Sequence, residues 1–204
     1  IACLFFGFWS VQSLRSLEAL TEKIILARAM VNHVALHLKP SDLIVNIKEA
    51  TMPEIGENAP DFTLPVTGGD PVTLSEMKGH SVVLFFYPRD DTSGCTRENE
   101  DFTALKDQFE ALGCKVFGIS KDTIESHDKF MAKKSLTIPL LSDAEGDVCE
   151  RYGVWKEKKM YGKTFMGIER STFLIAKDGT IAQAWNKVKV PDHAAAVLEA
   201  VKAF

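Results

Sequence analysis

The sequence predicts an α/β fold, a central mixed β-sheet with helices on both faces. Residues 82–87 form an apolar run of the length and composition of a strand buried on both sides. Beyond Cys95, apolar residues recur at three- and four-residue steps, as on the buried face of a helix: Phe102, Leu105, Phe109 and Leu112. The remaining pattern alternates strand and helix before a β-hairpin and a closing helix, an order typical of α/β domains.

Short elements precede the apolar run. Residues 61–64 and 71–74 are predicted to be short strands, because a turn-forming stretch of Val66-Thr67-Gly68-Gly69-Asp70 separates them. Residues 75–79 are predicted to form a short helical turn. Pro88 then ends the apolar run, since proline has no N–H to give to a strand partner.

The second half of the chain repeats the alternation. A second buried strand is predicted at 115–120, where Gly118 allows a close approach of neighbouring side chains. A turn at Lys177-Asp178-Gly179 joins the two strands of the hairpin. Pro191 is expected to open the last helix. The other predicted elements are a helix at 123–134, a short strand at 140–141, a helix at 144–152 and the hairpin strands at 171–176 and 180–185.

Composition excludes several classes of protein. A net charge of −4 and a pI near 5.8 argue against a nucleic-acid-binding surface, which would be basic. The four cysteines form no C-x-x-C pair and no zinc spacing, so we expect no metal site and a reducing compartment, the cytoplasm. No run approaches the roughly 18 apolar residues that a membrane span requires.

The chain divides into two parts. Residues 52–204 carry the α/β pattern, whereas residues 1–51 form an N-terminal extension with apolar residues at helical spacing among charged ones. Two interpretations of the extension remain open. It is an amphipathic helix that lies on this protein, a partner or a membrane surface, or translation starts at Met52 and the extension is not native.

Cys95 is the candidate reactive residue. It is placed at the beginning of the predicted helix, just beyond the carboxyl end of the first buried strand. The first N–H groups of a helix lack partners within the helix, and the helix dipole is positive there. Both effects favour a thiolate over a thiol. An inert cysteine usually lies within an apolar face, whereas polar residues flank Cys95.

These residues resemble a known family. Pro88, Thr92 and Cys95 reproduce the P-x-x-x-T-x-x-C signature of the peroxiredoxins, and YPRDDTSGCTRE is similar to their bacterioferritin-comigratory, or PrxQ, branch. The likeness extends over residues 52–204 and implies a thioredoxin-like fold. It is carried by GENAPDFTLP from Gly56, LSDAEGDV from Leu141, YGVW from Tyr152, YGKTFMGIERSTFLIAKDG from Tyr161 and WNKVKVPDHAAAVLEAVKA from Trp185.

The resemblance implies a thiol peroxidase that reduces hydrogen peroxide and small organic hydroperoxides without a metal, haem or flavin. The Cys95 thiolate would attack the peroxide O–O bond and become a sulfenic acid. Donors must then hold the peroxide oxygens, and the candidates are Thr92 Oγ1, the backbone N–H groups near Gly94 and Cys95, and Arg170, which matches the family's second arginine. Pro88 would shield the sulfur from water.

Alternatives accompany each of these roles. Thr92 is also suited to cap the helix, and Arg170 to form a surface pair with Glu169. Glu98 either satisfies backbone donors in the first turn or orients Arg170. A carboxylate near the sulfur would disfavour its thiolate, so we expect Asp90 and Asp91 to point to solvent.

The other cysteines decide the catalytic subclass. Many members of the branch carry a resolving cysteine five residues after the reactive one, where this chain has Glu100, and others carry it in the next helix, which has none here. Cys114 is expected to pack in the core, and Cys149 to be partly exposed on a short helix, with a resolving role open for both. The sequence therefore predicts a one-cysteine enzyme.

An external thiol must then reduce Cys95, and the candidates are thioredoxin, glutaredoxin and glutathione. The protein is expected to be a monomer or a homodimer. The alternative function is that of a redox-sensing or chaperone-like protein, in which oxidised Cys95 serves as a signal and is not an intermediate of a catalytic cycle.

Overall fold

The computed structural model describes residues 51–160 and 162–204. The predicted extension therefore lies outside the described residues, and the division at residue 51 stays a prediction. The described part contains, in chain order, β1 (Thr63–Leu64), β2 (Val72–Thr73), the 3₁₀ helix η2 (Leu74–Met77), β3 (Ser81–Phe86), α2 (Ser93–Ala111), β4 (Cys114–Ser120), α3 (Ile124–Lys134), β5 (Leu140–Ser142), α4 (Val148–Arg151), β6 (Trp155–Met160), β7 (Lys163–Ile168), β8 (Ser171–Ile175), β9 (Ile181–Trp185) and α5 (His193–Lys202).

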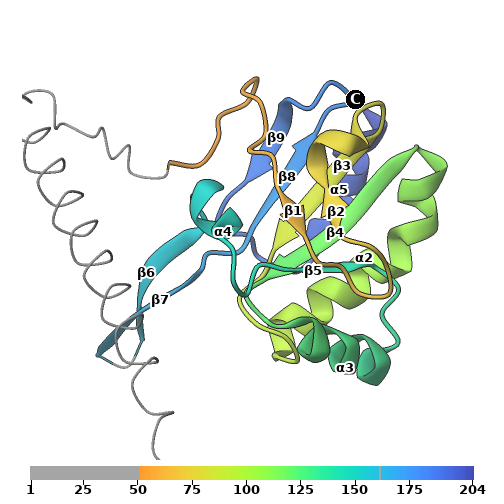
Figure 1. The fold of residues 1–204 in the computed structure, drawn as a ribbon. Helices are drawn as coiled ribbons and strands as arrows, with labels where there is room; N and C mark the ends of the chain where they lie inside the picture. The colour runs from red at the N-terminus through yellow and green to blue at the C-terminus, as the bar shows by residue number, and fades with distance from the viewer. Residues whose placement is uncertain (1–50, 161) are drawn as a thin grey trace, which may run out of the picture. The chain divides into compact units, whose positions relative to one another are not determined.

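A mixed five-stranded sheet forms the centre, in the order β5-β4-β3-β8-β9 (Figure 1). β3 pairs in parallel with β4 and antiparallel with β8, so it has a partner on each side along its length. All six of its residues are buried. The predicted buried strand is therefore the middle of the sheet, and the predicted α/β class with a mixed sheet is confirmed.

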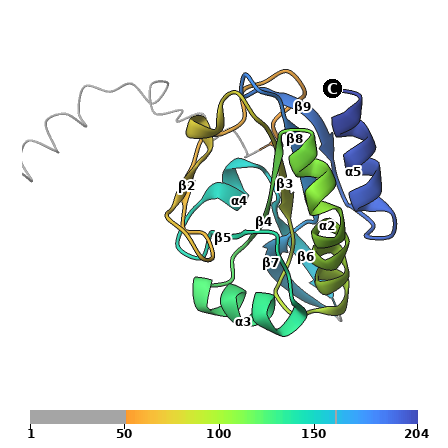
Figure 2. The ribbon, with the colours of Figure 1, turned by 90° about the vertical axis from the view of Figure 1, so that its right-hand side faces the viewer.

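Alternate residues of β3 contribute to two separate cores, because successive side chains of a strand point to opposite faces. Val83 and Phe85 pack with α2, α3 and α5. Leu84 and Phe86 pack with β1, α4 and the chain around Tyr152 on the other face. Figure 2 shows α2 and α5 on one side of the sheet, and α4 and β2 on the other.

Gly118, in β4, lies between two bulky side chains of the neighbouring strands. A Cβ atom at this position would come within 2.7 Å of the Phe85 ring and 2.8 Å of a Leu140 methyl group. Both neighbours are fully buried and belong to the flanking strands. The predicted close approach at Gly118 is confirmed.

The structure differs from the sequence prediction in two predicted helices and in one hairpin that was not predicted. The helix predicted at 144–152 is only Val148–Arg151, because the Asp143 carboxylate accepts the N–H groups of Val148 and Cys149 and starts the helix there. The last helix begins at His193, with Asp192 at its N-cap, instead of at Pro191. The third difference is the antiparallel hairpin of β6 and β7, which the sequence did not predict.

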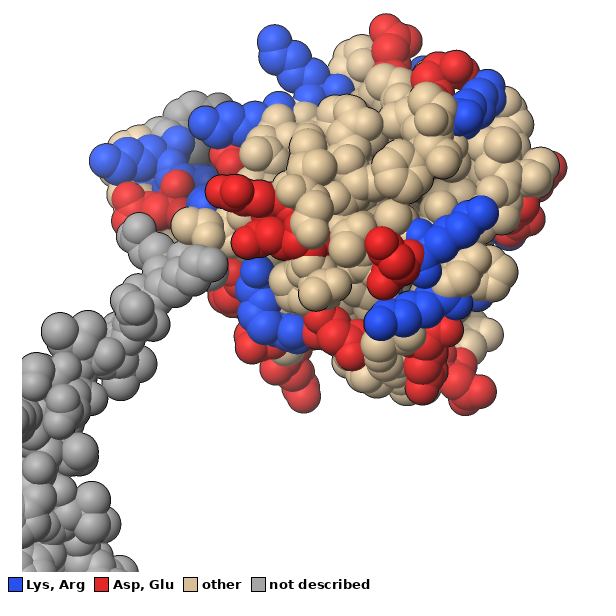
Figure 3. Space-filling view, turned by 90° about the horizontal axis from the view of Figure 1, so that it is seen from above, with Lys and Arg blue, Asp and Glu red and all other residues tan. Residues whose placement is uncertain are grey.

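Charges of both signs are interspersed on the face that Figure 3 shows, without a broad basic field. Within residues 51–160 and 162–204, no helix combines the length and the hydropathy needed to cross a membrane.

Candidate active site

Cys95 lies in the first turn of α2, directly past the loop that leaves β3. Its side chain is 1% exposed and belongs to the core between the sheet and α2. The N–H of Thr96 donates to the Thr92 carbonyl (2.8 Å), a bond of the first helical turn, which also contains Cys95. The side-chain amide of Asn99, one turn further along α2, donates to the Cys95 carbonyl (2.9 Å). This bond helps to fix the backbone at Cys95.

Arg170 reaches the sulfur from the connection between β7 and β8. Its Nη2 lies 3.2 Å from Cys95 Sγ, and its Nη1 binds the Glu98 carboxylate on the next turn of α2. Burial alone would lower the pKa of Arg170, but Glu98 and Cys95 outweigh it and raise the pKa. A permanently charged guanidinium therefore lies against the thiol.

Glu98 is almost fully buried, with 1% of its surface exposed. Burial raises the pKa of its carboxyl to about 7, against the opposing effect of Arg170. Its Oε2 is bound to Arg170, while Oε1 is buried with no hydrogen-bond partner in the described structure. Of the two interpretations of Glu98, the geometry matches the one that orients Arg170.

Thr92 occupies the N-cap position of α2, but its hydroxyl makes no capping bond. Instead, Oγ1 donates to the Arg89 carbonyl (3.2 Å) and lies on an exposed residue. Gly94 approaches Arg170, since a Cβ atom there would lie 3.5 Å from Nη2. Pro88 is exposed at the end of β3. The structure thus brings Cys95, Glu98, Gly94 and Arg170 together, with Thr92 and Pro88 on the adjoining loop.

Asp90 does not point to solvent, and this expectation was wrong. It is 8% exposed, and its carboxylate accepts hydrogen bonds from Tyr87 Oη (2.8 Å) and Ser126 Oγ (2.7 Å) and pairs with His127 Nδ1 (2.9 Å). Burial would raise the pKa of the Asp90 carboxyl, but the contacts to His127, Ser126 and Tyr87 lower it below its usual value. Buried partners thus compensate its charge.

Asp91, in contrast, is exposed as expected and pairs with Lys133 of α3. Its backbone has a φ of 54°, a left-handed conformation that is uncommon outside glycine. The Asp90 N–H donates to the Asp122 carboxylate (2.9 Å). Contacts to both aspartates therefore tie the loop that precedes Cys95 to α3 and its N-terminal end.

His193 is a residue near the site that sequence reasoning did not single out. It is 7% exposed, and its Nε2 lies 2.8 Å from Thr172 Oγ1 on β8. Burial, reinforced by the Arg170 cation, lowers the pKa of His193 to about 4. The imidazole is consequently neutral at physiological pH. Its partner Thr172 lies 21 residues earlier in the chain, so no local spacing pattern in the sequence indicates this contact.

Cys114 and Cys149 are free thiols in the described structure, and both are buried. Cys114 is 1% exposed and pairs with Ser81, at the end of β3 opposite to Cys95. Burial raises its pKa to about 12. Cys149 is fully buried, so the expected partial exposure was wrong. It lies in the core on the other face of the sheet, and burial together with Asp143 raises its pKa well above the ordinary value.

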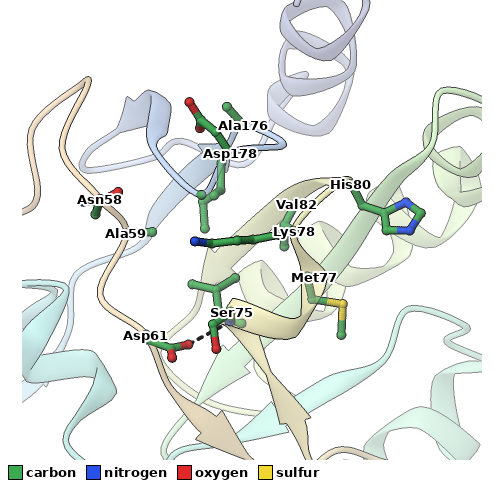
Figure 4. Close-up of a pocket in the computed structure, with 13 residues that line it drawn as sticks. Asn58, Ala59, Asp61, Ser75, Met77, Lys78, His80, Val82, Ala176 and Asp178 are labelled. Atoms are coloured by element: carbon green, nitrogen blue, oxygen red, sulfur yellow. Dashed lines mark hydrogen bonds between the residues drawn. The ribbon is translucent and has the colours of Figure 1, made fainter.

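A pocket of about 280 Å³ lies away from Cys95, at the end of the sheet where β3 begins. Val82, Lys78 and Asp178 contribute to its walls, and Figure 4 shows Lys78 reaching across it toward Ala59. The hydrogen bond drawn in Figure 4 joins the Asp61 carboxylate to the backbone N–H of Ser75. Across the described parts of the chain, no three histidine, cysteine or acidic side chains are grouped as a metal site would need.

Comparison with known proteins shows the family of the chain. A profile described as the AhpC/TSA family matches residues 55–184. Peroxiredoxin Bcp of Xanthomonas campestris is 50% identical over 143 residues, which are 70% of this chain and 89% of the relative. Peroxiredoxin Bcp of Bacillus subtilis is 48% identical over 149 residues, 73% of this chain and 95% of that protein.

Solved structures give the same result. The bacterioferritin comigratory protein of Xanthomonas campestris, described in connection with its alkyl peroxide reduction activity, is 47% identical with a TM-score of 0.68, covering 74% of this chain and 96% of its own. A cysteine mutant of Xylella fastidiosa PrxQ is 41% identical with a TM-score of 0.71, covering 75% and 98%. The thioredoxin-like fold is thereby confirmed. The chain belongs to the AhpC/TSA family and, within it, to the Bcp/PrxQ branch of the peroxiredoxins, which are thiol-dependent peroxidases.

Proposed function

We propose that Cys95 is the peroxidatic residue of a one-cysteine peroxidase that an external thiol reduces. The observation that carries the proposal is the 3.2 Å contact between Arg170 Nη2 and Cys95 Sγ. A guanidinium at this distance stabilises a thiolate, and its planar fork is suited to bind a peroxide oxygen at the same time. Family membership favours this peroxidase over the alternative of a redox-sensing or chaperone-like protein.

The first half-reaction forms an S–O bond and breaks the O–O bond. The Cys95 thiolate attacks the terminal oxygen of the peroxide, the sulfur becomes a sulfenic acid, and the second oxygen leaves as water or an alcohol once it takes a proton. Negative charge builds up on the leaving oxygen, so donors near the sulfur lower the barrier. We assign this role to Arg170, to the backbone N–H groups at Gly94 and Cys95, and to Thr92 Oγ1.

Two external thiols complete the cycle. The first attacks the sulfenic sulfur and releases water, which leaves a mixed disulfide on Cys95, and the second displaces Cys95 as its thiolate. Thioredoxin, glutaredoxin and glutathione are the proposed reductants, acting on hydrogen peroxide and small organic hydroperoxides. The alkyl peroxide reduction named for the Xanthomonas campestris relative supports the substrate class. We propose the cytoplasm as the compartment, because this cycle depends on a supply of reduced thiols.

The positions of the other cysteines support external reduction. Cys114 lies at the far end of β3, and six strand residues span about 20 Å. The sheet separates Cys149 from Cys95, since the two belong to cores on opposite faces. A disulfide needs Cα atoms within about 7 Å, so neither cysteine is in reach without unfolding. We therefore propose that neither Cys114 nor Cys149 resolves Cys95.

Mass spectrometry on the wild-type protein and the Cys95→Ser variant tests this function. One equivalent of hydrogen peroxide should add one oxygen to the wild-type protein, trapped by a sulfenic-acid reagent at Cys95. Cys95→Ser should take up no oxygen and consume no peroxide in the presence of a thiol system. A loss of two hydrogens with a crosslinked Cys95–Cys149 or Cys95–Cys114 peptide would show instead that the protein resolves itself.

A further inference from the structure

The β6–β7 hairpin brings a lysine next to the segment that carries Arg170. In the hairpin register, Lys158 faces Phe165, and Lys156 faces Gly167. Residues on alternate positions of a strand share a face, so Lys158 and Gly167 lie on the same side of the hairpin. The Lys158 stem passes over Gly167, where an added Cβ atom would lie 3.6 Å from Cδ. The stem of Lys158 is therefore directed along β7 toward its end.

The ammonium of Lys158 reaches the last residue of β7. Its Nζ donates to the carbonyl of Ile168, which lies two residues before Arg170. The Ile168 side chain is buried in the core, so this carbonyl belongs to a fixed part of the backbone. Lys158 thereby joins the hairpin to the start of the connection that carries Arg170.

Further bonds hold that connection on either side of Arg170. The Glu169 N–H donates to the Val154 carbonyl (2.7 Å), and the Arg170 carbonyl accepts from the Val188 N–H (2.9 Å). These bonds fix the backbone, and the direction of the guanidinium then follows from its contacts to Glu98 and Cys95. Among these three bonds to the connection, the bond from Lys158 is the one whose donor is a charged side-chain group.

The electrostatic surroundings of Lys158 are those of the active site. Burial is the main cause that lowers the pKa of its ammonium, and the nearby Arg170 cation adds to it, whereas Glu169 and Cys95 oppose the change. A cation that is partly withdrawn from water and close to another cation is unfavourable unless anions compensate it. A Cys95 thiolate supplies such compensation, and by reciprocity the ammonium favours the thiolate.

We infer that Lys158 is a positioning residue for the peroxidase reaction: through the Ile168 carbonyl it holds the chain at Arg170 so that the guanidinium faces Cys95, and its positive charge helps to keep Cys95 as a thiolate. The inference rests on the proposed function of Cys95. It differs from the roles assigned above, because Lys158 acts on the sulfur from a distance and from a separate hairpin.

The test compares Lys158→Met, Lys158→Arg and Lys159→Met. Lys159 is the matched control, since it is the next residue of β6, is exposed and faces the other side of the hairpin. Three quantities are measured for each variant: the pH midpoint of thiolate absorbance in the ultraviolet, the second-order rate constant with hydrogen peroxide across pH, and the melting temperature. The thiolate titration needs no turnover, so it tests Lys158 even if the wild-type protein proves to be a poor peroxidase.

Lys158→Met should move the midpoint of thiolate formation upward by about one pH unit, and should lower the rate constant at neutral pH roughly tenfold. Lys158→Arg should recover part of both, because it keeps a charge and a donor, and Lys159→Met should match the wild type. A Lys158→Met variant whose titration and rate equal those of Lys159→Met would overturn the inference. So would a lower melting temperature combined with an unchanged thiolate midpoint, which would assign Lys158 a purely structural role.

Discussion

The carboxylate of Asp90 lies 2.9 Å from Nδ1 of His127, within the protein and five residues before Cys95 in the chain. His127 is fully buried, and its Nε2 lies 3.3 Å from the Leu141 carbonyl. Both ring nitrogens thus face oxygen atoms, one of the Asp90 carboxylate and one of the Leu141 carbonyl. The pair joins the active-site loop to α3.

Replacing His127 by alanine should destabilise the protein by about 3 kcal/mol, because it leaves the buried Asp90 carboxylate without its hydrogen-bonded imidazole partner. The low pKa of Asp90 in the folded state contributes stability that is present above the usual aspartate pKa and is lost as pH falls through the folded value. In His127→Ala, burial without this partner should raise the pKa of Asp90, so the loss of stability relative to the wild type should be largest near neutral pH and should shrink as pH falls into the acid range. Urea unfolding across pH measures this, with the exposed Asp128→Asn as a control. The same dependence of unfolding free energy on pH in the wild type and in His127→Ala, below neutral pH, would contradict this prediction.

Glu98→Gln should change the pH dependence of stability in the opposite sense. Burial raises the folded pKa of Glu98 from 4.5 to about 7, so its contribution is fully present below pH 4.5 and is lost as pH rises through 7. Glutamine has no such titration, so the variant should lack this decline between mildly acidic and mildly alkaline pH. Its peroxidase rate should fall as well, because Arg170 loses its orienting partner. The exposed Glu100→Gln serves as the control for stability and rate.

Arg170→Lys should lower the second-order rate with hydrogen peroxide by about a hundredfold, the order expected when one donor to a developing oxyanion is lost. Lysine keeps the charge but not the two-pronged contact that joins Glu98 and Cys95. The control is Arg97→Lys: Arg97 lies on α2 near Cys95, but its exposed side chain pairs with Asp101, so the rate should be unchanged. A wild-type rate in Arg170→Lys would limit the arginine to a structural role.

Gly118→Ala should cost about 2 kcal/mol of stability, since an added methyl group meets Phe85 and Leu140 inside 3 Å in the middle of the sheet. The control is Gly69→Ala, whose added Cβ would come only to 3.5 Å from Val66. Chemical denaturation of both variants measures the difference. If Gly118→Ala proved as stable as Gly69→Ala, the sheet would have room that the packing does not show.

The parts of the fold that follow from the sequence are those with a strong local pattern. The buried run of β3 and the helical spacing of α2 each lie in one contiguous segment. Gly118 lies at a point of the sheet where the packed side chains leave room only for a glycine. The β6–β7 hairpin carries no such pattern. Lys156, Lys158 and Lys159 place charged side chains on both faces of β6, so the alternation that indicates a strand is missing.

The candidate site likewise combines residues that a local sequence pattern indicates with residues that only the tertiary fold brings together. Its cysteine is recognisable because a thiol, a preceding strand and a following helix are neighbours in the chain. The burial of Asp90 is not predictable in this way, because its partner His127 lies 37 residues away and acts only through the tertiary fold. The contact of Lys158 with Ile168 likewise depends on a hairpin register that composition does not reveal.

Cys95 and Arg170 lie 75 residues apart in the chain, and Arg170 directly precedes β8. The guanidinium can face the sulfur only after β8 has paired with β3 and completed that side of the sheet. During synthesis, Cys95 leaves the ribosome well before its arginine does. A nascent or half-folded chain thus presents Cys95 without its guanidinium neighbour, and the contact that carries the proposed peroxidase function is a property of the finished fold.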